Sequence, residues 1–202
     1  MRVSKVMAVV AGLLQARHIP NAISVLRIGF IYPVMLALLE QRYQDALYWF
    51  IAAGVSDGVD GFIAKQCGWT SRLGSLLDPA ADKLLLLTAY GMFGLYGLLP
   101  WPLVLAVFLR DIVIVGGAAA YWFLLRPFDA KPLLLSKINT VLQILLVAAV
   151  MFSHGVRPLA DAVLNFLIAC TFATTGLSGL LYVLLWSNNG WHEWRQQRSK
   201  SP

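Results

Sequence analysis

Residues 56–83 read SDGVDGFIAKQCGWTSRLGSLLDPAADK, a stretch that places four aspartates between long apolar segments. They are Asp57, Asp60, Asp78 and Asp82, in a chain of 202 residues that has only 10 acidic residues in all. The first two are spaced i, i+3 and the last two i, i+4, so each pair shares one face of a helix. The stretch therefore predicts two neighbouring helices, joined by a short loop, whose four carboxylates point into one small volume.

Four carboxylates gathered in this way predict a metal centre. Without a cation they would repel one another, and several would have to take up protons. Hard oxygen ligands suit Mg²⁺, Mn²⁺ or Ca²⁺, and four carboxylates exceed what one Mg²⁺ usually takes from a protein. We therefore expect two ions, held by all four aspartates. Paired ions of this kind clamp the attacking and leaving oxygens of a phosphoryl displacement.

The composition predicts an integral membrane protein. The hydrophobic fraction is 59% and the charged fraction is 13%, whereas a soluble domain carries about 25% charged residues. Long apolar segments are typical of membrane-spanning helices, because an unpaired backbone group in lipid is costly. We expect an all-α integral membrane fold with six transmembrane helices. The expected spans are Ala22–Leu39, Ala46–Ile63, Leu73–Leu99, Trp101–Phe123, Leu134–Phe152 and Ala162–Trp186.

The basic residues predict the orientation of these spans. Most lysines and arginines of the loops and ends fall on one side, whereas the other side has only Arg42 and Arg157. By the positive-inside rule both termini and the aspartates are then cytoplasmic, which in a bacterium means the inner membrane. The net charge of +6 fits contact with anionic lipid and gives no reason to expect nucleic acid. The cytoplasmic basic residues are Arg2, Lys5, Arg17, Lys65, Arg72, Arg126, Lys131, Arg195, Arg198 and Lys200.

Three segments are expected along the chain: an amphipathic juxtamembrane helix over residues 1–19, a transmembrane domain over 20–187 and a basic cytoplasmic tail over 188–202. The first segment also resembles a secretory signal, with a basic start and an apolar middle. However, no small-x-small cleavage site follows, and apolar residues from Val3 to Leu14 share one helical face. We therefore prefer a helix that lies on the membrane surface. The two cysteines, Cys67 and Cys170, are expected to be free thiols.

The spacing around the aspartates is specific. From Asp57 to Asp82 it reads D-x-x-D-G-x-x-A-K-x₈-G-x-x-x-D-x-x-x-D. This pattern resembles the signature of the CDP-alcohol phosphotransferases, a family of integral membrane enzymes that make phospholipids. The chain differs from the signature at Lys65, where the family usually has arginine. Lysine keeps the positive charge but loses the bidentate fork of the guanidinium group.

Flanking segments resemble one branch of this family over about residues 18–185. IPNAISVLRIGFIYPV, from Ile19 on, is similar to the first helix of the phosphatidylglycerol and cardiolipin branch. RDIVIVGGAAAY, from Arg110 on, and KPLLLSKINTVLQILLVAA, from Lys131 on, resemble eukaryotic-type cardiolipin synthases. Phosphatidylglycerophosphate synthases commonly carry R-E-I-x-x-S-x-L-R in the fourth helix, whereas this chain lacks the second arginine and has Ala118 and Ala119 there.

The resemblance implies a phosphatidyl transfer from CDP-diacylglycerol to an alcohol, with release of CMP. Asp82 would be the general base as well as a metal ligand, and Mg²⁺ or Mn²⁺ would be the cofactor. The acceptor would be phosphatidylglycerol, giving cardiolipin; the alternative is glycerol-3-phosphate. Family members resemble one another in forming homodimers. The donor nucleotide would contact Gly61, Ala64, Lys65, Gly74 and Asn21, and phosphates of donor or acceptor would contact Arg27, Arg110 and Lys137.

Other interpretations of these residues stay open. Arg110 precedes Asp111, so a structural ion pair is as reasonable as acceptor binding. Asn139 and Thr140 fit interhelical hydrogen bonds. Intramembrane acids also mark channels and transporters, but those acids are spread across the membrane depth, whereas these aspartates sit at the cytoplasmic ends of two adjacent helices. The complete set of four aspartates argues against an inactive scaffold.

Overall fold

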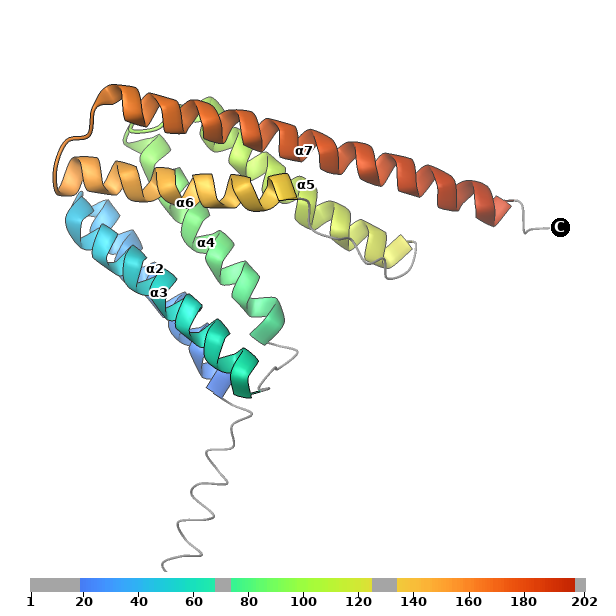
Figure 1. Ribbon diagram of the computed structural model, residues 1–202, viewed down its shortest axis with the longest axis horizontal. Coiled ribbons are helices and arrows are strands. Elements are labelled where there is room, and N and C mark those ends of the chain that lie inside the picture. Colours follow the sequence, from blue (N-terminus) through green and yellow to red (C-terminus); the bar gives the residue numbers. More distant parts are fainter. Residues whose placement is uncertain (1–18, 68–73, 125–133, 199–202) are drawn as a thin grey trace, which may run out of the picture. The chain divides into compact units, whose positions relative to one another are not determined.

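The structure is a computed structural model that describes the backbone of residues 19–67, 74–124 and 134–198, and the side chains of residues 29–56, 58, 82–117 and 134–185. Within these ranges the chain forms six helices and no strand (Figure 1). This confirms the all-helical prediction for the described part of the chain; the helix expected over residues 1–19 lies outside it except for Ile19. The helices are α2 (Ile19–Leu39), α3 (Tyr43–Cys67), α4 (Gly74–Leu95), α5 (Trp101–Leu124), α6 (Leu134–Gly155) and α7 (Asp161–Arg198).

Each helix overlaps one predicted apolar segment, but several helix ends differ from the prediction. The third segment was expected to reach Leu99, whereas α4 ends at Leu95. Gly97 adopts a φ of 70°, and the Leu98 amide donates to the Phe93 carbonyl oxygen at 2.8 Å. This left-handed cap stops the helix, because glycine takes a positive φ without steric cost. At the other extreme, α7 continues to Arg198, so residues 188–198 of the expected tail are helical.

The chain divides into two compact units. Unit 1 comprises residues 1–92 and 151–158, and unit 2 comprises residues 93–150 and 159–202. Unit 1 therefore contains α2, α3, most of α4 and the last turn of α6. Unit 2 contains the end of α4, α5, most of α6, and α7. The four aspartates of the motif belong to unit 1, and Arg110 and Lys137 belong to unit 2.

In unit 1, α2 packs against α3 along apolar positions at helical spacing (Figure 1). Fully or almost fully buried side chains recur every three or four residues on both helices, as expected for facing stripes. They are Val34, Ala37 and Leu38 on α2, and Ala46, Leu47, Phe50 and Ala53 on α3. This packing holds the segment of α3 that precedes the first two aspartates.

The turn between α2 and α3 is tight and polar. Gln41 adopts a φ of 56°, and the Arg42 amide donates to the Ala37 carbonyl oxygen at 2.8 Å. The Arg42 guanidinium donates to Glu40 at 2.7 Å and to Asp45 at 2.6 Å, and these hydrogen bonds raise the pKa of Arg42. Because all three side chains are exposed, the ion pairs contribute little to stability.

The last turn of α6 meets the first turn of α3 within unit 1. The rings of His154 and Tyr43 lie 5.6 Å apart. A Cβ atom added to Gly155 would lie 2.3 Å from the Gln44 backbone nitrogen and 2.7 Å from the Tyr43 carbonyl carbon. The two backbones therefore approach so closely that only glycine fits at this position.

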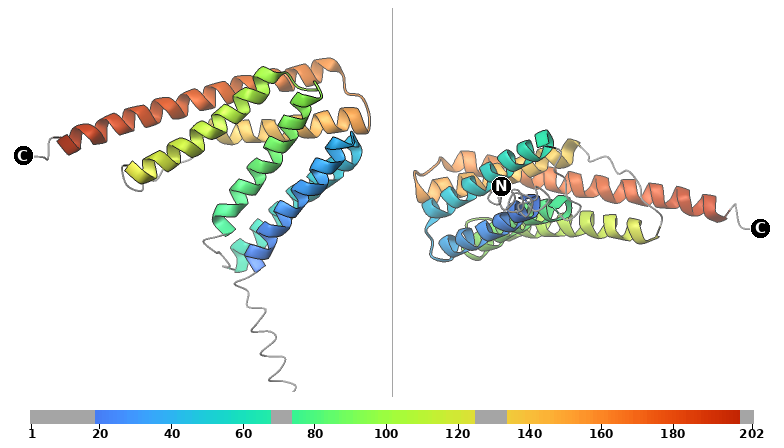
Figure 2. Two further views of the ribbon diagram at one scale, coloured as in Figure 1. Left: turned by 180° about the vertical axis from the view of Figure 1, so that it is seen from behind. Right: turned by 90° about the horizontal axis from the view of Figure 1, so that it is seen from below.

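In unit 2, α5 packs against α7 (Figure 1 and Figure 2). The interior of unit 2 holds apolar residues of α5 and α6, among them Leu103, Val107, Leu146 and Val150. It also holds an unusual number of polar side chains with at most 9% exposure, which are Arg110, Asp111, Asn139, Gln143, Thr171, Thr175 and Ser178.

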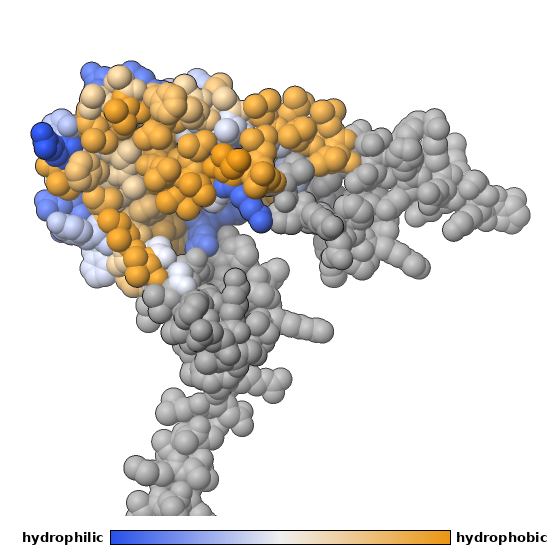
Figure 3. Space-filling model, in the orientation of Figure 1, coloured by the Kyte–Doolittle hydropathy of each residue, from blue (hydrophilic) through white to orange (hydrophobic). Residues whose placement is uncertain are grey.

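Large apolar side chains lie outside, the reverse of a soluble protein. Leu105, Leu109, Ile112 and Val115 form an exposed stripe along α5, and 61–66% of the surface of the first three is accessible. Figure 3 shows apolar residues over much of the visible face. Among the described residues, two segments are long and apolar enough to cross a bilayer, Leu134–Gly155 and Asp161–Leu185.

Candidate functional site

The helices carry the four aspartates where the spacing predicts them. Asp57 and Asp60 lie on α3, and Asp78 and Asp82 lie on α4. The Asp82 side chain is half-buried, whereas the other three carboxylates lie outside the described side chains. Figure 1 and Figure 2 show the C-terminal end of α3 and the N-terminal end of α4 at the same end of unit 1.

The two aspartate pairs lie at similar distances from the helix ends that face the segment joining α3 to α4. At about 1.5 Å per residue, Asp57 and Asp60 lie roughly 15 and 10 Å before the end of α3. Asp78 and Asp82 lie roughly 6 and 12 Å after the start of α4 by the same measure. Along its own helix, Asp57 is thus about as far from the joining segment as Asp82 is, and Asp60 is somewhat farther than Asp78.

The predicted donor-binding residues lie on the same helices. Gly61, Ala64 and Lys65 are on α3, and Gly74 is the first residue of α4. Lys65 was expected in the loop between the spans, but α3 continues to Cys67, so Lys65 is helical. Asn21 and Arg27 are on α2, and the side chains of both lie outside the described ones.

The small residues of α3 leave its face open. A Cβ atom added to Gly54 or Gly58 would meet nothing within 4 Å. Among the described residues, no side chain therefore fills the space next to either glycine. Within this part of the chain, close helix packing, which is the usual reason for a small residue in a membrane helix, does not account for them.

The donor set fits a divalent cation by its chemistry, because all four predicted ligands are carboxylates. Among the side chains that the structure describes, no three histidine, cysteine, aspartate or glutamate residues come together. The carboxylates of Asp57, Asp60 and Asp78 are outside that set. The metal centre therefore stays a prediction from the spacing of the aspartates on α3 and α4.

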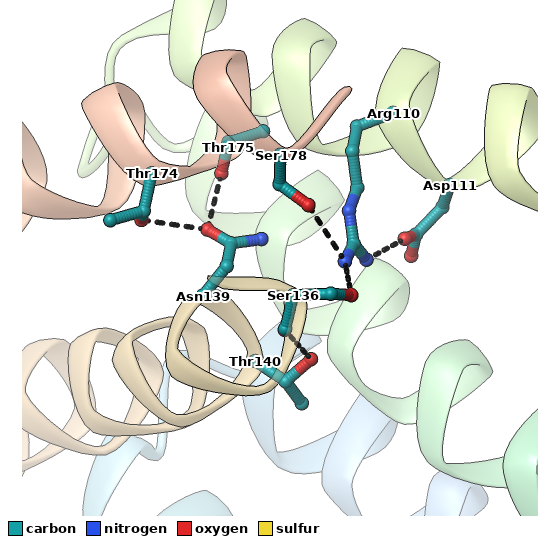
Figure 4. Close-up of polar contacts among 8 residues, drawn as sticks. All are labelled: Arg110, Asp111, Ser136, Asn139, Thr140, Thr174, Thr175 and Ser178. Atoms are coloured by element: carbon teal, nitrogen blue, oxygen red, sulfur yellow. Dashed lines mark hydrogen bonds and ion pairs between the residues drawn. The ribbon is translucent and has the colours of Figure 1, made fainter. Parts of the chain in front are cut away.

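The Arg110 junction, defined as Arg110, Asp111, Ser136 and Ser178, joins three helices of unit 2 (Figure 4). Arg110 is 6% exposed, and its Nη1 donates to Asp111 Oδ1 at 2.6 Å. Its Nη2 donates to the Ser136 hydroxyl on α6 and, at 3.4 Å, to the Ser178 hydroxyl on α7. Both terminal nitrogens are bonded, whereas Nε is buried without a hydrogen-bond partner among the described residues. The ion pair with Asp111, one of the two interpretations that the sequence left open, is thus present.

A second polar contact joins α6 to α7 next to this junction. Asn139 is fully buried, and its Oδ1 accepts hydrogen bonds from Thr174 at 2.9 Å and Thr175 at 2.8 Å (Figure 4). The expected interhelical bond of Asn139 is confirmed. Thr140 instead donates to the Ser136 carbonyl oxygen at 3.1 Å, within its own helix.

The sequence did not predict the hydrogen-bond partners of Arg110 and Asn139. These partners are Ser136, Thr174, Thr175 and Ser178. One signal was available: Thr171, Thr175 and Ser178 repeat at i, i+4 and i+7 in an otherwise apolar segment, which is one face of a helix. By contrast, Lys137 follows Ser136 directly and is exposed, as a residue that meets a ligand must be.

The chain is similar to known phosphatidyltransferases over most of its length. Cardiolipin synthase (CMP-forming) of Rattus norvegicus is 34% identical over 183 residues, which cover 81% of this chain and 60% of that protein. The chloroplastic CDP-diacylglycerol–glycerol-3-phosphate 3-phosphatidyltransferase 1 of Oryza sativa subsp. japonica is 32% identical over 197 residues, covering 87% of this chain and 60% of that protein. The CDP-diacylglycerol–glycerol-3-phosphate 3-phosphatidyltransferase of Aquifex aeolicus is 28% identical over 173 residues, covering 84% of this chain and 92% of that protein.

The chain thus spans about three fifths of the length of the rat and rice relatives. The family model for CDP-alcohol phosphatidyltransferases matches residues 17–177, which contain all four aspartates, Arg110 and Lys137. This match extends over most of the chain and over five of the six helices in full. The chain belongs to the CDP-alcohol phosphatidyltransferase family.

Proposed function

We propose that this protein transfers a phosphatidyl group from CDP-diacylglycerol to an alcohol acceptor and releases CMP. The observation that carries the proposal is the spacing of four aspartates on α3 and α4, inside the region that the family model matches. The relatives include both a CMP-forming cardiolipin synthase and glycerol-3-phosphate phosphatidyltransferases, and these names support the reaction class.

The aspartates divide the chemistry between them. Asp57, Asp60, Asp78 and Asp82 would hold two divalent cations, and the chemistry that Mg²⁺ or Mn²⁺ would supply there is neutralisation of the pyrophosphate charge. Asp82 also accepts the proton of the acceptor hydroxyl. The hydroxyl oxygen bonds to the phosphorus next to the diacylglycerol, the bond from that phosphorus to the bridging oxygen breaks, and CMP leaves with the electron pair.

The proposed nucleotide and phosphate contacts are those that the family resemblance implies. The bare face of α3 at Gly61 and Ala64, with Gly74 at the start of α4, lets the cytidine diphosphate approach the backbone, and Asn21 and Lys65 bind its polar groups. Phosphate recognition depends on Arg27, Arg110 and Lys137. A guanidinium or ammonium group bonded to phosphate is among the strongest hydrogen-bonding arrangements in proteins.

The surface supports placing this site in a membrane. Among the described side chains of unit 2, seven polar ones are buried beside apolar ones, while leucines and valines face outward along α5 and α7, as hydrocarbon requires. We therefore propose that the chain crosses the membrane six times and has a juxtamembrane helix over residues 1–19. Both termini and the aspartates would lie on the cytoplasmic side, and the protein would form a homodimer.

Phosphatidylglycerol is the proposed acceptor, which makes the product cardiolipin. A small dianion such as glycerol-3-phosphate needs several fixed cations, since each charge-assisted hydrogen bond contributes roughly 1.5–3 kcal/mol. This chain has Ala118 and Ala119 where phosphatidylglycerophosphate synthases carry a second arginine. A lipid acceptor needs fewer cations, because its tails already hold it in the bilayer and its phosphodiester bears one charge.

Glycerol-3-phosphate is the second candidate acceptor, because the Aquifex relative, whose name specifies it, is matched over 92% of its length. The test supplies purified full-length chain and CDP-diacylglycerol with each acceptor in mixed micelles, and separates the lipid products. Cardiolipin formed with phosphatidylglycerol supports the proposal. If phosphatidylglycerophosphate formed and cardiolipin did not, the acceptor would be glycerol-3-phosphate, and the proposed reaction class would still hold.

A further inference from the structure

Two nitrogen donors in the interior of unit 2 have no hydrogen-bond partner among the described residues. They are Nε of Arg110, on α5, and Nδ2 of Asn139, on α6. Arg110 is 6% exposed and Asn139 is fully buried, so neither donor is open to bulk solvent. Nearly all buried polar groups in proteins are bonded, either to protein or to ordered water, because an unbonded one destabilises the folded state.

The register of α6 against α7 brings these two donors close together. Ser136 and Ser178 both accept from Arg110 Nη2, and Asn139 accepts from Thr175 at 2.8 Å. Three residues forward on α6 thus correspond to three residues backward on α7, which is the register of two antiparallel helices. At 1.5 Å per residue, the Asn139 amide and the Arg110 guanidinium lie roughly 4.5 Å apart along the helices.

The Ser178 hydroxyl lies between the two donors. Figure 4 shows it between the amide of Asn139 and the guanidinium of Arg110, and it accepts from Arg110 Nη2 at 3.4 Å, which is long for a hydrogen bond. A hydroxyl oxygen has a second lone pair, so it can accept from another group as well. Polar groups of α5, α6 and α7 therefore converge in the interior of unit 2.

The chemistry of these groups selects what binds among them. Nε and Nδ2 both donate, so the bound molecule must offer two acceptor lone pairs. It needs no charge, because Asp111 already neutralises Arg110 at 2.6 Å. It must be small, because Arg110, Asn139 and Ser178 are at most 6% exposed. Water meets all three requirements, and buried waters in proteins typically make about three hydrogen bonds to such groups.

We propose that unit 2 binds one structural water molecule, which accepts hydrogen bonds from Arg110 Nε and Asn139 Nδ2 and donates one to the Ser178 hydroxyl. This water is a second link between α5 and α6, beside the bond from Arg110 to Ser136. Surrounding hydrocarbon offers no substitute for it. The inference concerns unit 2 alone and does not depend on the proposed reaction.

The direct test is the nuclear Overhauser effect between water and side-chain N–H protons in the isotope-labelled full-length chain in micelles. The Arg110 Nε signal is assigned by its loss in Arg110→Lys. We expect cross-peaks to water from Arg110 Nε and Asn139 Nδ2, and none from the backbone amide of Val147, which is fully buried on the same helix as Asn139. Absence of the Arg110 cross-peak, in a sample where the exposed Arg42 shows one, would overturn the proposal.

Ser178→Ala is the control for protons that reach the donors by exchange through the nearest hydroxyl. The cross-peaks should persist in this variant, because two donors still hold the water. Their disappearance together with the hydroxyl would overturn the proposal, as would cross-peaks to detergent or lipid protons in place of water.

Melting temperature is an independent readout. Arg110→Lys and Asn139→Ala each remove one donor to the water together with direct bonds that the two residues do not share. Each should lower Tm by at least about 2–4 °C, the shift that corresponds to one lost hydrogen bond in a chain of this size. The double variant should lose less than the sum, because both single variants release the same water. Additive losses would show that nothing links the two donors and would overturn the proposal.

Discussion

At the scale of single residues, the chain departs from its family at Lys65. This residue lies on the last turns of α3, beyond the aspartates Asp57 and Asp60. If its ammonium binds a donor phosphate, Lys65→Ala should lower kcat/KM for CDP-diacylglycerol by about 10- to 150-fold, the equivalent of roughly 1.5–3 kcal/mol. Lys65→Arg should retain activity because it restores the family's usual residue. Steady-state kinetics with varied donor decide this, and a silent Lys65→Ala would make the residue a solvated charge.

The spacing of residues predicted the helix on which each one lies, but not the side chains to which it is hydrogen-bonded. The aspartates lie on the two helices that their i, i+3 and i, i+4 spacing predicted, because helical periodicity is a local property. Asn139 was expected to bond across helices because a buried amide in an apolar segment must be satisfied. Its partners, Thr174 and Thr175, were not predicted, since they depend on the register between α6 and α7, which no local pattern contains.

At the scale of elements, one contact between helix ends tests the packing of unit 1. Gly155→Ala should lower the free energy of unfolding by about 1–3 kcal/mol, because the new methyl group would overlap the backbone of α3. A Cβ there would lie 2.3 Å from the Gln44 nitrogen. Thermal unfolding in detergent measures the change.

Gly54→Ala is the matched control, because a Cβ at that position meets nothing within 4 Å. It should be neutral or stabilise by about 0.5–1 kcal/mol, since alanine is the better helix former. If Gly155→Ala melted no lower than Gly54→Ala, the close approach of α6 and α3 in unit 1 would be wrong.

The sequence predicted helix ends well where a proline marks the break, and less well where a single glycine or a change to polar composition was the only signal. Pro100 and Pro158 mark the breaks before α5 and α7, as expected for residues that cannot continue a helix. The early end of α4 depends on the left-handed Gly97, which a count of apolar residues overlooks. The extension of α7 to Arg198 shows that a polar composition ends the apolar segment without ending the helix.

At the scale of the whole molecule, the orientation in the membrane is open to a direct test. Val156 is 50% exposed and follows α6, on the side with few basic residues. In a chain with Cys67 and Cys170 replaced by serine, Val156→Cys should react with a membrane-impermeant maleimide from outside intact cells. Ser201→Cys should react only after permeabilisation. Equal labelling of both from outside would contradict cytoplasmic termini and the cytoplasmic aspartates.

Metal dependence is tested most directly by CMP release from CDP-diacylglycerol by purified full-length chain, with and without divalent cation. We expect release that requires Mg²⁺ or Mn²⁺ and falls to background in Asp57→Asn, Asp60→Asn and Asp78→Asn, because each amide removes a charged ligand of the same site. The variants should bind less Mn²⁺ while they keep the helical content of the wild type. Undiminished CMP release in excess chelator, or in any of the three variants, would contradict a metal-dependent site built from these aspartates.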